Sequence, residues 1–308
     1  MNKGLIISLI AGVYKVYDLD TCEKVLCKPR GVLRIKGVTP KVGDYVEYTI
    51  EGELGIIENI KERSNDLIRP YICNIDQTFV IFSVKEPDLN LNLLDKFLVT
   101  LEYNNILPII IFNKWDLLND LEQKEIKEII NYYSQIGYKT IITSTKDNLI
   151  NDLKDYLNDK ISVFTGQSGV GKSSLLNVLD PSLVLSTNEI SLALGRGKHT
   201  TRHVELLKIE NGWIADTPGF GTIDFEGMEK TDLAHNFIEF FKVSNECKYN
   251  GCLHLNEPSC MVKKHVNEGL IRKSRYENYQ TFINDLGKDK KDRDFSPVNT
   301  NNKRRRKK

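Results

Sequence analysis

The sequence lacks any apolar run long enough to cross a lipid bilayer. Its longest apolar stretch, residues 106–112, is far shorter than the roughly 20 residues that a transmembrane helix needs. The first residues also lack the cleavage pattern of a signal peptide. We therefore expect a cytoplasmic protein that does not associate with membranes.

Cysteine is scarce as well, with six residues in a chain of 308. Without a secretory signal, so few cysteines do not indicate a disulfide framework. Cys22 and Cys27 have no histidine or further cysteine close by in the sequence, and we expect them to be ordinary buried residues.

A cluster of metal-binding residue types lies near the C-terminal end. Three thiols and one imidazole fall within residues 247–260, a combination that suits tetrahedral zinc and leaves no coordination position open for catalysis. The pattern predicts one structural zinc ion, which would stabilise a small region whose size alone could not. The predicted ligands are Cys247, Cys252, His254 and Cys260.

Excess charge of either sign is also missing, because the formal net charge is only +1. The exception is the end of the sequence, where residues 303–308 are all cationic and follow a polar stretch at 297–302. This composition predicts a disordered basic tail over residues 288–308. The tail is either merely solvated or an arm that contacts RNA phosphates, and without aromatic residues it would read little sequence.

The first 65 or so residues contain short apolar and β-branched runs separated by glycines. Five closely spaced strands predict a small OB-like β-barrel, which is either a nucleic-acid-binding module or a packing module. The predicted strands are residues 5–10, 13–17, 32–35, 45–50 and 56–60.

Apolar runs alternate with helical patterns from about residue 78 onward. This alternation predicts an α/β domain with a mainly parallel sheet covered on both faces. The clearest helix runs from an N-cap at Asn119 to Gly137, with apolar residues spaced to face the sheet. The predicted strands are residues 78–84, 106–112, 139–143 and 161–165.

A glycine-rich loop, GQSGVGKS, follows the run at 161–165 and opens a helical stretch. It matches the phosphate-binding pattern G-x₄-G-K-[ST], whose glycines turn backbone N–H groups toward phosphate oxygens. Lys172 would reach the β- and γ-phosphates, and the Ser173 hydroxyl would hold magnesium. The predicted phosphate site comprises Gly166, Gln167, Ser168, Gly169, Val170, Gly171, Lys172, Ser173 and Ser174.

The sequence DTPG at 216–219 ends another apolar run, residues 212–215. A carboxylate at the end of a strand is where nucleotide hydrolases place the aspartate that supports magnesium. We therefore assign this role to Asp216, and we expect the amide of Gly219 to face the γ-phosphate.

The sequence NKWD at 113–116 closes the run at 106–112. A carboxylate at its last position can accept hydrogen bonds from both N1–H and the exocyclic amine of guanine, which adenine does not offer. A backbone N–H after the next strand would face the base oxygen. GTP and GDP are thus the expected nucleotides, with base-binding residues Asn113, Lys114, Trp115, Asp116 and Ser144.

The base-reading motif precedes the phosphate loop and the magnesium aspartate in the chain. A circular permutation produces this order, because strand ends converge in space however the strands are linked. With the barrel, NKWD, GQSGVGKSS, GRGKHTT at 195–201, DTPGF and the Cys/His cluster, residues 1–285 resemble the circularly permuted GTPases, and among them the RsgA family of small-ribosomal-subunit biogenesis GTPases. One departure is Ser144-Thr145, where that family usually has Ser-Ala.

The resemblance implies a monomeric GTP hydrolase that binds the small ribosomal subunit and its rRNA in the GTP state and is released on hydrolysis. The segment 195–201 would be a switch loop in which Thr200 or Thr201 binds magnesium, and the spacing does not decide between them. Phe220 stands where Ras-like enzymes have the glutamine that orients water. We therefore expect slow turnover alone and faster turnover on the subunit. His199 is the local catalytic candidate beside Lys172, and the alternative is that it is a solvent-exposed histidine with no catalytic role.

Four parts are predicted: an OB-like barrel (1–66), a circularly permuted GTPase domain (67–225), a zinc-binding helical domain (226–287) and a basic tail (288–308). Two alternatives stay open at this point. One is a P-loop ATPase or small-molecule kinase in which NKWD is accidental. The other is an RNA-binding assembly factor that uses nucleotide only as a structural element.

Overall fold

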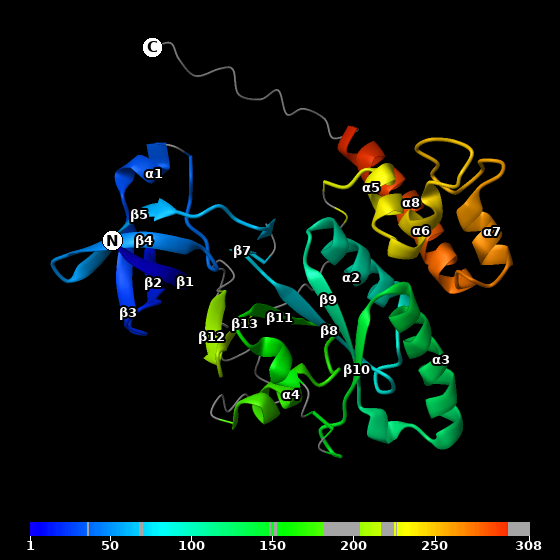
Figure 1. Cartoon of the computed structure of the whole chain (residues 1–308), viewed down its shortest axis with the longest axis horizontal. Coiled ribbons are helices and arrows are strands. Elements are labelled where there is room, and N and C mark those ends of the chain that lie inside the picture. Colours follow the sequence, from blue (N-terminus) through cyan, green and yellow to red (C-terminus); the bar gives the residue numbers. More distant parts are fainter. Residues whose placement is uncertain are drawn as a thin grey trace, which may run out of the picture. The chain divides into compact units, whose positions relative to one another are not determined.

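The computed structural model describes most of the chain as two compact units, Met1–Asp224 and Phe225–Lys308. We treat each unit separately (Figure 1). The described residues are 1–35, 37–67, 70–147, 149–150, 153–181, 204–216, 225 and 227–294.

Five strands at the start of the first unit form a closed barrel. β1 pairs with both β2 and β4, and β3 pairs with β2 and β5, so the order β1-β2-β3-β5-β4 returns to β1. The predicted five-stranded barrel is therefore confirmed. Its strands are β1 (Asn2–Ile10), β2 (Val13–Asp18), β3 (Lys24–Pro29), β4 (Tyr45–Glu51) and β5 (Leu54–Ile60).

The predicted strand at residues 32–35 is wrong, because these residues belong to the short helix α1 (Gly31–Ile35). Leu33 is buried there, whereas Val32 and Ile35 are exposed, so the apolar residues do not line one face of a sheet. The third strand of the barrel is instead β3, whose exposed lysines and terminal proline hid the alternating pattern.

The barrel continues into the sheet of the α/β part in the order β10-β9-β8-β11-β13-β12. The first five of these strands run parallel, and β12 runs antiparallel to β13. The mainly parallel sheet is thus confirmed. Its strands are β8 (Gln77–Ser83), β9 (Leu107–Asn113), β10 (Lys139–Ile142), β11 (Ile161–Thr165), β12 (Glu205–Ile209) and β13 (Gly212–Asp216); the short pair β6 (Asp66–Leu67) and β7 (Ile72–Cys73) precedes them.

Within the described residues, three helices of more than one turn accompany this sheet: α2 (Leu91–Tyr103), α3 (Asp120–Ile136) and α4 (Lys172–Leu179). Helix α3 begins at the predicted N-cap, where Asn119 and Glu122 form a reciprocal capping box. It ends at Gly137, whose φ of 128° suits glycine. The short 3₁₀ turns η1 (Trp115–Leu117) and η3 (Asp155–Leu157) complete the local structure.

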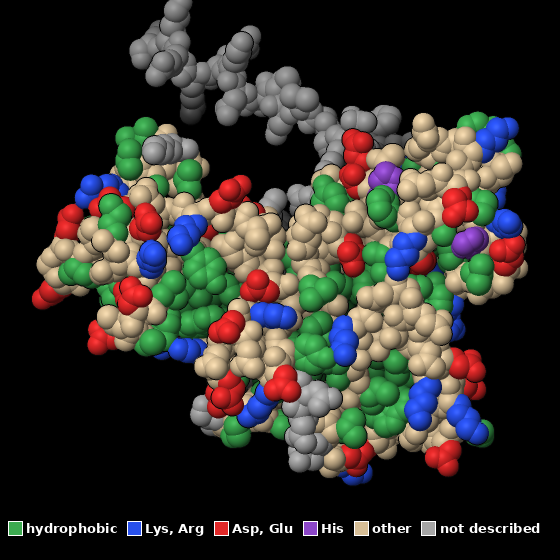
Figure 2. All heavy atoms as spheres, in the orientation of Figure 1, with side chains coloured by type: hydrophobic (Ala, Val, Ile, Leu, Met, Phe, Trp, Pro, Cys, Tyr) green, Lys and Arg blue, Asp and Glu red, His purple; other side chains and the backbone are tan. Residues whose placement is uncertain are grey.

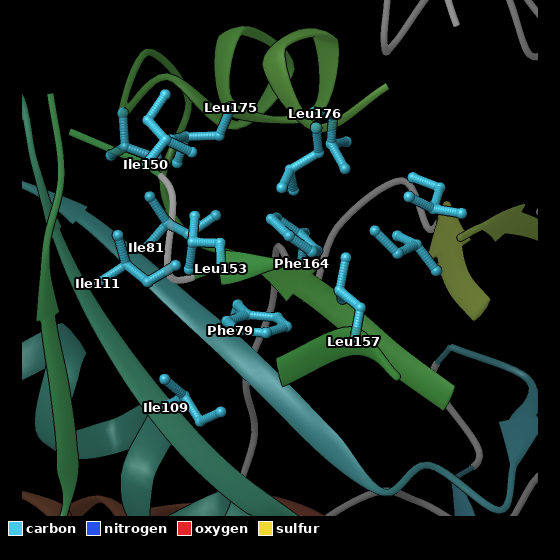
Figure 3. Close-up of a cluster of buried hydrophobic side chains, with 14 residues drawn as sticks. Phe79, Ile81, Ile109, Ile111, Ile150, Leu153, Leu157, Phe164, Leu175 and Leu176 are labelled. Carbon is cyan, nitrogen blue, oxygen red and sulfur yellow. The ribbon is translucent and has the colours of Figure 1, made fainter. Parts of the chain in front are cut away.

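The core of the α/β part lies between one face of the sheet and α4 (Figure 3). Alternate residues of the central strands, such as Phe79 and Ile81 in β8, point toward Leu175 and Leu176 of the helix. Every residue of β8 is buried, as a parallel strand covered on both faces requires. This packing holds the helix that begins at the phosphate loop.

The second unit contains α5 (Lys230–His235), α6 (Ile238–Ser244), α7 (Met261–Asn267) and α8 (Lys273–Asp294). Its core is aromatic: Phe237 and Phe240 stack at 4.8 Å, and Tyr279 lies edge-on to both. Helix α8 extends beyond the boundary predicted at residue 287, so the predicted tail begins inside this helix. Residues 295–308 lie outside the described part.

No helix within the described ranges is both long and apolar enough to span a bilayer. On the face shown in Figure 2, acidic and basic side chains are interspersed on each unit. This mixture agrees with the small net charge and shows no large patch of a single sign in that view.

Candidate nucleotide and metal sites

The predicted nucleotide motifs meet at one edge of the sheet. Strands β8, β9, β10, β11 and β13 are parallel, so their carboxyl ends lie together, where open α/β sheets bind ligands. Asn113 closes β9, the glycine-rich loop follows β11, and Asp216 closes β13. Segments that are far apart in sequence therefore share one site.

Asn113 connects three of these segments. Its side chain is almost fully buried, and Nδ2 donates a hydrogen bond to the carbonyl of Val170 in the phosphate loop, at 2.8 Å. Thr143, after β10, donates from its hydroxyl to Asn113 Oδ1, at 2.9 Å. Asn113 thus joins the base-reading motif to the phosphate loop, and Thr143 is a partner that we did not predict.

Asp116 lies in the turn η1, directly after the base-reading strand. The Ser144 hydroxyl donates to Asp116 Oδ1 at 2.8 Å and accepts from the backbone N–H of Asp147 at 3.1 Å. The hydroxyl is therefore oriented on both sides, and it holds the carboxylate that would read guanine. Lys114, in a left-handed conformation, donates from Nζ to the carbonyl of Glu86.

At two glycines of the phosphate loop an added Cβ atom would collide with a neighbour, a backbone atom in one case and a side-chain atom in the other. A Cβ atom at Gly166, where φ is 146°, would lie 2.1 Å from the carbonyl oxygen of Ile81. A Cβ atom at Gly171, where φ is 93°, would lie 2.5 Å from Asn113 Nδ2. The loop can thus pack against the ends of β8 and β9 only because these side chains are absent.

Lys172, the first residue of α4, turns back over the loop. Its Nζ donates to the carbonyls of Gly166 at 2.7 Å and Gln167 at 2.5 Å, and burial lowers the pKa of its ammonium to about 8. No side chain caps the start of α4, so its first N–H groups face a site that suits anions. Gln167 Oε1 is buried and has no hydrogen-bond partner within the described residues. These features fit a bound phosphate chain.

The loop after β8 is part of the site and was missed. Glu86 accepts the Lys114 hydrogen bond, and Lys85 forms a 2.8 Å ion pair with Glu122, the capping residue of α3. This loop therefore connects the base-reading motif to the following helix. The sequence offers one signal for this loop. It directly follows β8, the strand that lies beside the strand β9 that ends in NKWD.

Several predicted site residues fall outside the described part of the chain: His199, Thr200, Thr201, Gly219 and Phe220. Ser173 and Ser174 lie in the first turn of α4, and Asp216 is the last residue of β13.

The predicted metal ligands in the second unit converge. The ligand atoms of Cys247, Cys252, His254 and Cys260 all lie within 4.8 Å of one another. His254 Nδ1 is 3.4 Å from the sulfur of Cys260 and 3.8 Å from that of Cys247. Tetrahedral zinc with Zn–S bonds of about 2.3 Å separates its ligand atoms by roughly 3.8 Å. The cluster therefore fits one zinc ion.

The surroundings of His254 also suit a closed site. Its Nδ1 faces the thiols, whereas Nε2 is buried and has no hydrogen-bond partner within the described residues. Burial lowers the pKa of this imidazole, which favours the neutral form that binds metal. The imidazole ring and the Phe240 ring meet nearly at right angles, with their centroids 6.0 Å apart.

The sheet order, the phosphate loop and the converging base-reading motif define a P-loop GTPase whose segments follow one another in circularly permuted order. Solved structures agree: "The crystal structure of YloQ, a circularly permuted GTPase" matches with a TM-score of 0.82 and 40% identity, covering 94% of this chain and 96% of that one. The structure of YjeQ from Thermotoga maritima gives 0.81 and 38%, covering 92% and 98%.

Sequence comparisons then give the family. The profile described as RsgA GTPase matches residues 60–226, and that of the RsgA N-terminal domain matches 3–57. The chain therefore belongs to the RsgA GTPase family, as the motifs predicted, and it is a GTP hydrolase. Small ribosomal subunit biogenesis GTPase RsgA 2 of Oceanobacillus iheyensis is 48% identical over 93% of this chain and 98% of its own length. RsgA of Bacillus subtilis is 46% identical over 95% and 100%.

Proposed function

We propose that this GTP hydrolase acts in late maturation of the small ribosomal subunit, binding the subunit in the GTP state and leaving after hydrolysis. The names of the relatives from O. iheyensis and B. subtilis support this role. The protein would work as a monomer in the cytoplasm and would contact rRNA. The barrel (1–66), the zinc-binding part (226–287) and the basic tail would supply these contacts beside the GTPase domain (67–225).

The observation that carries the nucleotide chemistry is the hydrogen bond from Asn113 to Val170, which places the base-reading motif beside the phosphate loop. Asp116, held by Ser144, would accept from guanine, and Lys172 with the loop amides would bind the phosphates. Ser173, Asp216 and one of Thr200 or Thr201 would hold magnesium. When bound, the magnesium ion neutralises charge on the phosphate oxygens.

Turnover on the free protein is proposed to be slow, because Phe220 cannot orient water as glutamine does. His199 is proposed to take that part when the protein is bound to the subunit. We expect small subunits to raise the rate of phosphate release roughly 10³-fold, the lower end of the effect that an arginine finger has on GTP hydrolysis. His199→Ala should remove most of this rise, and equal rates with and without subunits would contradict the proposal.

Guanine specificity is tested by Asp116→Asn with Asp120→Asn as the control, because Asp120 is an exposed carboxylate in the first turn of the neighbouring helix. Asp116→Asn should lose affinity for GTP and gain affinity for xanthosine triphosphate, and Asp120→Asn should do neither. Calorimetric titration with both nucleotides measures this exchange. An Asp116→Asn variant that keeps its GTP affinity would support an ATPase or kinase instead.

The second unit is proposed to bind one structural zinc ion through Cys247, Cys252, His254 and Cys260. Cobalt substitution should give thiolate-to-metal absorption, and chelation should unfold the helices of this unit. Cys260→Ser should lose the metal. The control is Cys22→Ser, which should retain one equivalent; Cys22 is exposed, contrary to our expectation of a buried residue, whereas Cys27 is buried as expected. A Cys260→Ser variant with full metal content would contradict the assignment.

A further inference from the structure

The barrel meets the GTPase sheet at its edge strand β12. Ser8 in β1 pairs with Glu205 in β12, and Lys15 Nζ lies 3.6 Å from Glu205 Oε1. Glu205 in turn pairs with Asp216, the last residue of β13. Adjacent strands lie about 4.8 Å apart, so the backbone of the barrel comes within about 10 Å of the backbone of Asp216.

A second contact lies at the turn end of the β12–β13 hairpin. Lys208 Nζ sits 4.5 Å from the centre of the Tyr17 ring and 5.9 Å from that of the Trp213 ring, and it also bonds to the Tyr17 hydroxyl. The two rings meet edge to face at 4.9 Å, and both are more than 90% buried. The ammonium is thus held between a barrel residue and a residue of the strand that ends at Asp216.

The hairpin is restrained on its other side. A Cβ atom at Gly212 would lie 1.9 Å from the carbonyl oxygen of Leu157, and the N–H of Trp213 donates to the carbonyl of Lys160 at 2.8 Å. The turn end therefore packs closely against the start of β11 and has little room to move. A displacement of the hairpin at its Asp216 end would therefore shift β12 against Ser8, Lys15 and Tyr17 of the barrel, which contact this strand.

We propose that Lys208 is a positioning residue that couples the nucleotide state of the GTPase site to the barrel. The inference rests on the proposed function, because it assigns Asp216 to the magnesium site. Coupling between two sites is reciprocal. A partner bound by the barrel would therefore change the relative affinity for GTP and GDP by the same factor as the nucleotide changes the affinity for that partner.

The test uses the two tryptophans of the chain and amide exchange in the barrel. Both tryptophans are replaced by 5-fluorotryptophan. The ¹⁹F resonance of Trp115 reports occupancy of the base site, and that of Trp213 reports the contact with Tyr17 and Lys208. The variant Trp213→Phe assigns the two resonances. Hydrogen exchange over β2, residues 13–18, then reports the barrel. Both are measured on the full chain with GDP and with a non-hydrolysable GTP analogue.

We expect β2 exchange to differ about fivefold or more between the two nucleotide states, the lower end of typical coupling. Lys208→Met, which keeps most of the side-chain stem, should reduce the difference below twofold, and Tyr17→Phe should reduce it in part. The control is Lys154→Met, because Lys154 pairs with Glu210 at the turn of the same hairpin, 3.2 Å apart, and the difference should persist there.

Equal β2 exchange in both states, or an undiminished difference in Lys208→Met and Tyr17→Phe, would overturn the coupling. The Trp115 resonance separates this failure from a failure of the proposed function. If it moves with guanine nucleotides in every variant, the base site is intact and only the coupling is refuted. If the Trp115 resonance does not change when guanine nucleotides are added, the proposed function is refuted together with this inference.

Discussion

Gly171→Ala tests whether the phosphate loop and the base-reading motif depend on one close contact. The added methyl carbon would lie 2.5 Å from Asn113 Nδ2, the atom that donates to Val170. Either the loop or the asparagine must move, and each movement breaks this buried hydrogen bond. The variant should therefore lose both stability and nucleotide affinity.

The magnitude follows from two separable costs. A residue with a side chain in a left-handed conformation costs about 1–2 kcal/mol, and Gly171 has a φ of 93°. A buried amide left without its partner costs about 1–3 kcal/mol more. Gly12→Ala is the matched control, because Gly12 has a φ of 81° but nothing within 4 Å of an added Cβ atom. It should show only the first cost.

Denaturant unfolding of the nucleotide-free protein and calorimetric titration with GTP measure the two consequences. Gly171→Ala should unfold about 1–3 kcal/mol more easily than Gly12→Ala. It should also bind GTP at least about tenfold more weakly, since 1.4 kcal/mol corresponds to a factor of ten. Equal stability and equal affinity for the two variants would refute the argument that this contact holds the site together.

Three further predictions concern single side chains. Arg275→Met should lower the free energy of unfolding by about 3–5 kcal/mol, because it leaves the buried Glu239 without its bidentate partner. The double variant Arg275→Met/Glu239→Leu should recover much of this loss. A double variant no more stable than Arg275→Met would contradict the prediction. GTP affinity should fall as the pH rises above about 8, because binding favours the ammonium of Lys172, whose pKa in the free protein is about 8; an affinity unchanged between pH 7 and pH 9.5 would refute the assignment. Ser144→Ala should weaken GTP binding about fivefold, the effect of one hydrogen bond of about 1 kcal/mol, and titration of Thr145→Ala should show no change.

Local patterns in the sequence were sufficient to predict strands β8, β9, β10, β11 and β13, helix α3 and the Cys/His cluster, but they did not predict the edge strand β12. The capping residue Asn119 and the closing Gly137 are set by neighbouring residues, and the four residues of the cluster lie within one short segment. The same holds for the glycine-rich loop, whose pattern is itself the signal.

Contacts between distant segments could not be predicted in this way. The hydrogen bond from Asn113 to Val170 depends on which strands are neighbours in the sheet, and local sequence patterns do not reveal that order. The contact of Tyr17 with Lys208 joins residues from the barrel and from the edge of the sheet. Helix α1 was taken for a strand because β-branched residues alone do not distinguish one helical turn from a short strand.

The order of the strands bears on how the chain matures as it leaves the ribosome that makes it. Strand β11, which precedes the glycine-rich loop, is synthesised after β8, β9 and β10 and pairs with the open edge of β8, and β13 later pairs with β11. Until β11 is synthesised, that edge of β8 has no partner strand. The NKWD segment at the end of β9 is therefore synthesised well before the glycine-rich loop and Asp216, which lie later in the chain.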